Sequence, residues 1–453
     1  MKNEKMMKEA SPIKLLFTMG LPTIVVMIVQ VLYHMADVFF IGQSGDPMQV
    51  AALSLAGPAF SIFQGVGTLF GGGACTAIAM ALGQGDRDKA KYFSSFCAWG
   101  SVITGVVLAI VMFIFMDPLL GLMGANAETA GFARTYLSIV ILGSPFVMFS
   151  GGLGNAIRAD GSSAKTMLIA LAGTFTNILL DPLFISVFGM GIAGAAWATV
   201  IGNVVTSGLV FLHVKKSGCF SISPRYFTLK KDVSLRVIGL GVPMAMGVVL
   251  GCVSGMFSNQ LLVKYGNIAV AANGVAGKAG MLVGMMAMGV CMGMQPVISY
   301  AYGMGDRRRL KRITFVTGAA SALVSAVLGS GLLLGRDAFM TAFLNDPQVL
   351  ETGRFMMLTL IAAPVGGIYQ LCSSFLQGTG KVSYATLTSL LSKGLVFVPV
   401  LFISEALDGF TGLVFAGAVS DLISTAIGAA LCLSWAKKSG GAVHSAAAVA
   451  EAV

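Results

Sequence analysis

The feature that most constrains this chain is a series of about twelve continuously apolar runs, each about 20 residues or longer. They lie near 15–42, 50–82, 95–116, 134–157, 165–188, 191–214, 236–263, 269–302, 313–335, 354–377, 382–407 and 410–436. With 56% hydrophobic and 11% charged residues, the chain carries more apolar surface than a water-soluble fold can bury. The runs do not alternate, as lipid-facing β-strands would. We therefore expect an all-α integral membrane protein with twelve transmembrane helices.

The basic residues predict how these helices are oriented. If the N-terminus is cytoplasmic and the helices alternate, most of the 29 lysines and arginines fall at the cytoplasmic face. The exceptions are Arg134, Lys264, Arg336 and Arg354 at the outer face, and Lys278 and Lys393 inside apolar runs. This positive-inside pattern predicts a multi-pass protein of the cell inner (plasma) membrane with both termini cytoplasmic. It also explains the net charge of +10, so a nucleic-acid partner is not expected.

The chain repeats itself once. The segment "MALGQGDRDKAK" (80–91) corresponds to "YAYGMGDRRRLK" (300–311), and "VAALSLAGPA" (50–59) corresponds to "VAANGVAGKA" (270–279). Each half contains six apolar runs, and an even number gives both halves the same orientation in the membrane. We expect an N-terminal lobe (1–220) and a C-terminal lobe (221–453), related by duplication. Two such parallel lobes predict a central cleft and alternating access.

Four polar residues inside the apolar runs of the first half have no counterpart in the second half: Asp37, Asn177, Asp181 and Thr199. Asn177 and Asp181 are four residues apart and therefore share one helix face. Asp37, Asp181 and Thr199 all lie roughly 8–12 Å below the outer surface, at about 1.5 Å per helical residue. These groups can therefore converge on one site in the first lobe.

A carboxylate inside a membrane has two interpretations. It can hydrogen-bond one helix to another, or it can mark an ion or substrate pathway, which intramembrane acids do by default. Burial disfavours the charged form, so Asp37 and Asp181 suit proton exchange near neutral pH. The same oxygens could instead hold a sodium ion. Tyr33 and His34 precede Asp37 by one turn and share its face, which makes them candidates for the cleft.

The second half has polar residues of its own. Lys278, Lys393 and Asp421 replace small or uncharged residues of the first half. Either Asp421 neutralises one of the lysines, or the three residues line the cleft. The methionines of "GMLVGMMAMGVCMGMQ" (280–295) fill a helix interface or form an adaptable binding wall.

Several function classes find little support. "GVGTLFGGG" lacks the Lys–Ser/Thr end of a phosphate-binding loop. "GQGD" (83–86) and "GMGD" (303–306) resemble a motif of intramembrane aspartyl proteases, but they are repeat copies at the cytoplasmic ends of helices. The seven cysteines show no metal-ligand spacing. We expect neither an enzyme nor a cofactor or structural metal. A lipid or lipid-linked oligosaccharide flippase is the closest alternative to a carrier of small molecules, and it would require a wide cationic cavity.

The chain resembles the MATE (multidrug and toxic compound extrusion) transporters, most closely the bacterial DinF-like and MepA-like branch. The likeness lies in "LPTIVVMIVQVLYHMADVFFIG" (21–42), "NILLDPLFI" (177–185), "GIAGAAWATVIGN" (191–203) and the twelve-helix duplication. It implies a cation-coupling site formed by Asp37, Asn177, Asp181 and Thr199, with Asn155 as a fifth member. It further implies a monomeric antiporter that exports organic, often cationic, drugs and toxins across the bilayer in exchange for protons or sodium.

This sequence departs from the NorM-like branch of the same family. NorM-like members carry acids for a sodium site in the second lobe, in the helices that correspond to 236–263 and 354–377. Neither segment contains an acid here. The resemblance therefore implies coupling through the first lobe, by protons or, alternatively, by sodium.

Overall fold

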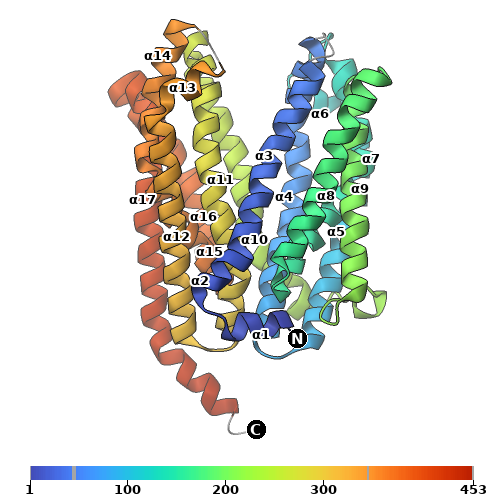
Figure 1. Cartoon of the computed structure of the whole chain (residues 1–453), viewed down its shortest axis with the longest axis vertical. Helices are drawn as coiled ribbons and strands as arrows, with labels where there is room; N and C mark the ends of the chain where they lie inside the picture. Colours follow the sequence, from blue (N-terminus) through green and yellow to red (C-terminus); the bar gives the residue numbers. More distant parts are fainter. Residues whose placement is uncertain (1, 43–46, 344–345, 451–453) are drawn as a thin grey trace.

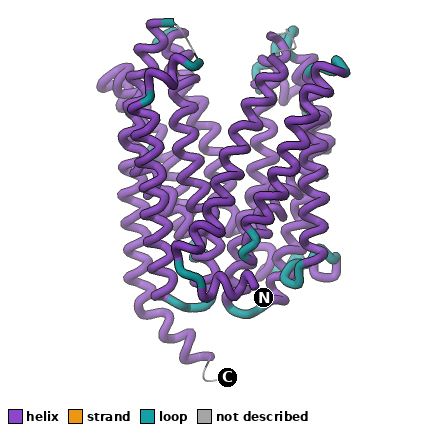
Figure 2. Tube along the Cα trace, viewed as in Figure 1, coloured by secondary structure: helices purple, strands orange, loops and turns teal. Residues whose placement is uncertain are grey.

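The computed structural model describes residues 2–42, 47–343 and 346–450, and every regular element in these ranges is a helix (Figure 2). The side chains of residues 34–38 lie outside the described part, so the predictions for His34 and Asp37 cannot be followed there. Eleven helical segments in the described ranges are long and apolar enough to cross a membrane. The last of them, 382–434, holds two spans, because Gly409 (φ 57°, ψ −128°) breaks the helix. The predicted all-α membrane fold is confirmed.

The first lobe comprises six spans with short helices at their ends. The spans are α2 (Pro12–Leu15) continuing through a π-helical turn (Leu16–Gly20) into α3 (Leu21–Gly42), α4 (Pro47–Gly83), α5 (Arg87–Ile114), α7 (Ala130–Ala156), α8 (Ser163–Pro182) and α9 (Ile192–Lys216). The short elements are α1 (Lys2–Glu9), α6 (Met116–Leu122), η2 (Ile157–Asp160), η3 (Leu183–Val187) and η4 (Pro224–Tyr226).

The second lobe repeats this arrangement. Its first four spans are α10 (Lys231–Val263), α11 (Asn267–Gly303), α12 (Arg307–Leu334), and α14 (Pro347–Met356) continuing through η5 (Met357–Ala362) into α15 (Ala363–Gly378). The fifth span is α16 (Val382–Leu390) with η6 (Leu391–Leu395) and the part of α17 (Phe397–Ala450) before Gly409, and the sixth is the part of α17 after it. The short α13 (Arg336–Thr341) precedes α14. Figure 1 shows two helix bundles that approach each other near the chain termini and diverge at the opposite end.

Near the termini the two lobes are in direct contact, and we call this contact region the seam. It has two equivalent halves, which involve corresponding positions of the sequence repeat. In one half of the seam Gly73 of α4 meets the Val237 carbonyl of α10, and a Cβ atom on Gly73 would overlap that oxygen. In the other half Gly293 of α11 meets the start of the first span, where a Cβ would lie 2.6 Å from the Met19 carbonyl oxygen. Glycine at both positions lets the backbones approach closely, as in membrane helix pairs.

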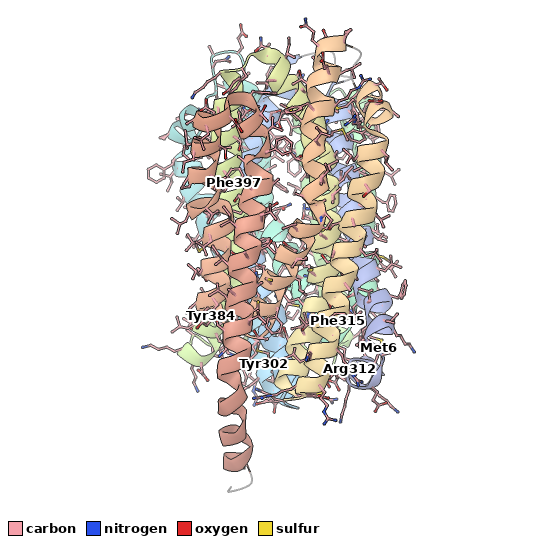
Figure 3. The ribbon with its side chains drawn as sticks, turned by 90° about the vertical axis from the view of Figure 1, so that its left-hand side faces the viewer. Met6, Tyr302, Arg312, Phe315, Tyr384 and Phe397 are labelled. Atoms are coloured by element: carbon pink, nitrogen blue, oxygen red, sulfur yellow. The ribbon has the colours of Figure 1, made fainter. Side chains whose placement is uncertain are left out.

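Helix α1 lies across the end of the molecule where the lobes meet (Figure 1). On the first lobe, the Glu4 carboxylate accepts a hydrogen bond from Arg87 Nη2 (2.6 Å) and contacts Cys219 Sγ (3.4 Å). On the second lobe, Arg309 of α12 donates to the Met7 carbonyl oxygen from Nε (3.1 Å) and Nη2 (2.5 Å). Figure 3 shows Met6 of this helix close to the same end of α12 as Arg312. The N-terminal segment, whose sequence predicts only a polar tail, therefore bridges both lobes.

The Cys219 thiol gives a test of this bridge. Burial, together with the hydrogen bond and negative charge of the adjacent Glu4 carboxylate, raises the pKa of Cys219 to about 11. Glu4→Gln should lower this pKa, so that more thiolate exists at pH 8 and alkylation by a maleimide accelerates about three- to tenfold. Peptide-resolved mass spectrometry separates Cys219 from the exposed Cys252. Glu9→Gln removes a carboxylate that pairs with Lys5 on the same helix, and it should leave the rate unchanged. Equal rates in both variants would contradict the assigned contact.

Candidate functional site

A cavity of about 560 Å3 lies between the two lobes. Helices α3, α4, α7, α8 and α9 of the first lobe and α10, α11, α15, α16 and η6 of the second lobe contribute to its walls. A volume of this size matches the pockets that bind drug-sized molecules. The cavity therefore corresponds to the central cleft predicted from the duplication.

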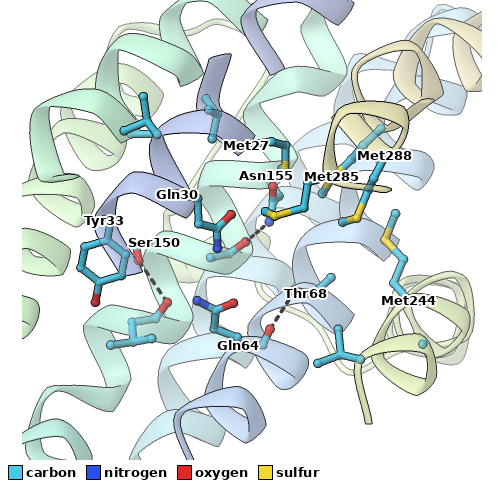
Figure 4. A pocket seen from close by; sticks show the side chains of 18 of the residues that line it. Met27, Gln30, Tyr33, Gln64, Thr68, Ser150, Asn155, Met244, Met285 and Met288 are labelled. Atoms are coloured by element: carbon cyan, nitrogen blue, oxygen red, sulfur yellow. Dashed lines mark hydrogen bonds between the residues drawn. The ribbon is translucent and has the colours of Figure 1, made fainter. Parts of the chain in front are cut away.

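The walls of the cavity combine thioethers with neutral polar groups (Figure 4). The thioethers are those of Met27, Met244, Met285, Met288 and Met292, and the amides include Gln30, Gln64, Gln295, Gln370 and Gln377. Other methionines of the 280–295 run, Met286 and Met294, are buried in helix interfaces. Both interpretations of that run therefore apply, to different faces of α11. Thioether walls adapt to ligands of different shape, because methionine is flexible and polarizable.

A hydrogen-bonded polar cluster lies at the first-lobe wall of the cavity. The Tyr33 hydroxyl and the Thr199 hydroxyl are 3.3 Å apart, and Asn177 Nδ2 donates to Thr199 Oγ1 at 3.5 Å. The cluster joins three helices, α3, α8 and α9. The structure thus brings together Asn177 and Thr199, as the sequence predicts, and adds Tyr33. Their part in ion coupling remains a prediction.

Close helix contact positions this cluster. A Cβ on Gly202 of α9 would lie 2.8 Å from the Gly173 carbonyl oxygen of α8 and 3.1 Å from Asn177 Cβ. Without side chains at these two glycines, the backbones of α8 and α9 approach each other, and Asn177 reaches Thr199. Small residues in the sequence of both helices are therefore as necessary to the site as its polar side chains.

Asp181 lies one helical turn beyond Asn177 and is 0% exposed, while Asn177 and Thr199 are each 2% exposed. The Asn177 Oδ1 atom receives no hydrogen bond from the described residues. An acidic side chain inside a membrane-spanning helix marks an ion or substrate pathway by default. Carboxylate, amide and hydroxyl oxygens are also the ligands that sodium accepts. The arrangement can therefore hold a proton or a hard monovalent cation.

Asn155 is not drawn into this cluster. Its Nδ2 donates to the Gly151 carbonyl oxygen (2.6 Å), and its Oδ1 accepts from Arg158 Nη2 (3.0 Å). Arg158 is 4% exposed and donates from Nη1 to the Met292 carbonyl oxygen (3.4 Å) of the other lobe. Asn155 lines the same cavity, but its described hydrogen bonds orient an arginine that links the lobes.

The second-lobe charges have three different environments. Lys393 lines the cavity, whereas Lys278 and Asp421 do not, which corrects the expectation that all three face the cleft. Lys278 is exposed, with Nζ 5.2 Å from the centre of the Phe343 ring. Asp421 is close enough to Lys393 for electrostatic attraction, but the described part of the chain shows no ion pair between them within 4.0 Å. Asp421 therefore attracts Lys393 from a distance, and its role in neutralising that lysine stays a prediction.

The sequence analysis did not single out the glutamines of the cavity or its Ser150–Asn203 hydrogen bond (2.9 Å). An amide side chain inside an otherwise apolar run, such as Gln64, is a sequence signal that could have identified these cavity residues. Gln30 precedes Tyr33 by three residues and therefore lies on the same face of α3.

A duplicated, all-helical membrane protein with a drug-sized cavity between its lobes has the architecture of a membrane carrier. The MatE family model matches residues 22–183 and 243–403, once in each lobe. The chain belongs to the MATE family.

Known relatives cover nearly its full length. The chain is 31% identical to the multidrug export protein MepA of Staphylococcus saprophyticus over 427 residues, covering 93% of this chain and 94% of that protein. It is 30% identical to MepA of Staphylococcus aureus over 410 residues, which is 90% of each chain.

The fold matches solved structures at lower identity. One is an outward-facing multidrug resistance MATE family transporter of the MOP superfamily, with a TM-score of 0.89 and 23% identity over 94% of this chain and 96% of that chain. Another is a MOP superfamily transporter from Pyrococcus furiosus, with a TM-score of 0.89 and 22% identity over the same shares of the two chains.

Proposed function

We propose that this chain is a secondary active multidrug efflux antiporter. It exports organic, often cationic, compounds in exchange for protons, with sodium as the alternative coupling ion. Its membership of the MATE family and its likeness to two MepA multidrug export proteins support this function. The observation that carries the proposal is the fully buried Asp181, one turn from a hydrogen-bonded cluster at the wall of a drug-sized cavity.

The proposed transport cycle starts from the outward-open arrangement of the two lobes. The lobes diverge at the end away from the termini (Figure 1), and with cytoplasmic termini that end is the outer one. A proton from outside neutralises Asp37 or Asp181. Loss of that charge lets α3 repack against α8, which weakens the contacts of Tyr33 with the substrate and releases it outside. The empty, protonated carrier then opens its seam and delivers the proton inside.

Reopening toward the cytoplasm requires specific contacts to break. Across the seam Gln295 Nε2 donates to Thr76 Oγ1 (3.1 Å), and Arg158 reaches the Met292 carbonyl. The first bond is neutral and stabilises the closed state by about 1 kcal/mol, and the second has a charged donor and contributes about 1.5–3 kcal/mol. A few such bonds hold the lobes closed without preventing the exchange of states.

Small molecules suit this cavity better than lipid-linked oligosaccharides. A volume of about 560 Å3 encloses a drug-sized ligand. A lipid pyrophosphate would need several cations, whereas one lysine is found among the described lining residues. In this proposal the carrier works as a monomer in the plasma membrane and uses no cofactor.

The coupling ion can be tested with purified protein in liposomes. A pH gradient and a sodium gradient are imposed separately, and the movement of a fluorescent cationic dye is followed. We expect transport with the pH gradient alone, because acidic side chains inside membrane helices serve as proton relays in transporters. A gradient of one pH unit supplies about 1.4 kcal/mol, enough for about tenfold accumulation of dye. Movement with sodium alone would change the ion but keep the site, while no movement under either gradient would contradict the antiport.

A further inference from the structure

Lys393 is the only residue with a formal charge among the described residues that line the cavity. The remaining polar lining groups are amides and hydroxyls, and the apolar ones are mainly thioethers and aliphatic side chains. The described wall of the cavity is therefore electrically asymmetric, with one fixed positive charge on the second-lobe side.

The fold exposes this lysine to the cavity at an irregular point of its helix. Lys393 lies in η6, a π-helical turn between α16 and α17, and such turns are frequent at functional sites. Its carbonyl oxygen accepts a hydrogen bond from Ser254 of α10, and the preceding Ser392 donates to the Tyr369 hydroxyl (2.6 Å). The backbone on both sides of the lysine is thereby fixed, which leaves the side chain as the movable part.

Among the described residues, the ammonium group has no carboxylate in direct contact. Asp421 attracts it but forms no ion pair with it within 4.0 Å and does not line the cavity. A half-buried ammonium gains from an anion that approaches from the open side, because such a pair is charge-assisted and weakly screened. The corresponding position in the first half is a glycine or its neighbour near 173, so the charge is a feature of one wall only.

We propose that Lys393 determines substrate specificity by binding an acidic group, such as a carboxylate, on an otherwise aromatic or apolar compound. This inference rests on the proposed export function and narrows its substrate class to amphiphiles that carry such a group, including zwitterions. The carboxylate pairs with Lys393, while the apolar body lies against Met244, Met285 and Met288 (Figure 4). An organic cation without an acidic group lacks this ion pair and is a substrate of lower affinity.

The test compares two forms of one dye. Purified full-length protein in detergent, without any ion gradient, is titrated with a zwitterionic rhodamine carrying a free carboxylate and with its cationic ethyl ester, and binding is followed by fluorescence polarisation. We expect the wild type to bind the free acid about tenfold tighter than the ester. Lys393→Met should abolish this preference, and Lys393→Arg should retain it.

Two variants guard against indirect effects. Lys278→Met removes a lysine from the same lobe outside the cavity lining, and it should leave the preference unchanged. Should Lys393→Met fail to fold because Asp421 loses its compensating charge, the double variant Lys393→Met/Asp421→Asn restores the balance and should also bind both forms equally. If folded variants without Lys393 still prefer the free acid, or if the wild type binds both forms equally, the role of Lys393 is overturned. The proposed export function would stand in either case. Failure of the wild type to bind either form would overturn the proposed drug export together with the inference.

Discussion

Asp181→Asn is expected to reduce ion-driven efflux to background, a loss of about 100-fold or more. The carboxylate is fully buried on α8, and asparagine has nearly the same shape but cannot exchange a proton. The variant should therefore fold and still bind dye, because Asp181 does not itself line the cavity. Efflux from liposomes under a pH gradient and dye binding in detergent measure the two properties separately. We expect the first to be lost and the second to remain.

The matched control is Asp232→Asn, which removes an exposed acid at the start of α10. It should transport at the wild-type rate. The sequence makes the same prediction for Asp37→Asn as for Asp181→Asn. Gradient-driven efflux at the normal rate in a well-folded Asp181→Asn protein would exclude this acid as the coupling group. Loss of dye binding along with efflux would instead indicate a structural role for the carboxylate.

Most of the fold could be predicted from the sequence because each membrane span follows from its own run of consecutive apolar residues. Twenty consecutive apolar residues can cross a bilayer only as a helix, and the repeat from 80–91 to 300–311 relates the two lobes. Asn177 and Asp181 share a face because their spacing is four residues. The contact between Asn177 and Thr199 was expected only from matching depth, and it depends on Gly173 and Gly202, which bring their helices together.

The rest of the site depends on helix rotation, which hydropathy does not specify. Lys278 and Lys393 look alike in the sequence, each a single cation in an apolar run, yet only Lys393 lines the cavity. Asn155 has the residue type of a site member, but its side-chain oxygen Oδ1 accepts a hydrogen bond from Arg158, three residues later. The bridge formed by α1 could not be predicted either, because Glu4 finds its partners 83 and 215 residues away in the chain.

The second large effect is expected at the seam between the lobes. An added Cβ at Gly73 would overlap the Val237 carbonyl oxygen and lie 2.9 Å from the Gly241 amide nitrogen. These are backbone atoms of α10, so they cannot rotate away as a side chain can. Forcing the helices apart should disfavour the closed seam by about 1–3 kcal/mol, which shifts the balance between inward-open and outward-open states about 5- to 150-fold.

The seam can be measured by cross-linking. In a background without the seven native cysteines, Thr76→Cys and Gln295→Cys place two thiols where a hydrogen bond now joins the lobes. Gly73→Ala should lower the yield of this cross-link and slow drug efflux, because a carrier that cannot close one side cannot complete its cycle. Gly57→Ala is the matched control on the same helix, since a Cβ there meets nothing within 4 Å. It should leave both measurements unchanged, because alanine also favours the helix. An undiminished cross-link in Gly73→Ala would mean that the lobes close without this glycine contact, and the gating role of the seam would have to be abandoned.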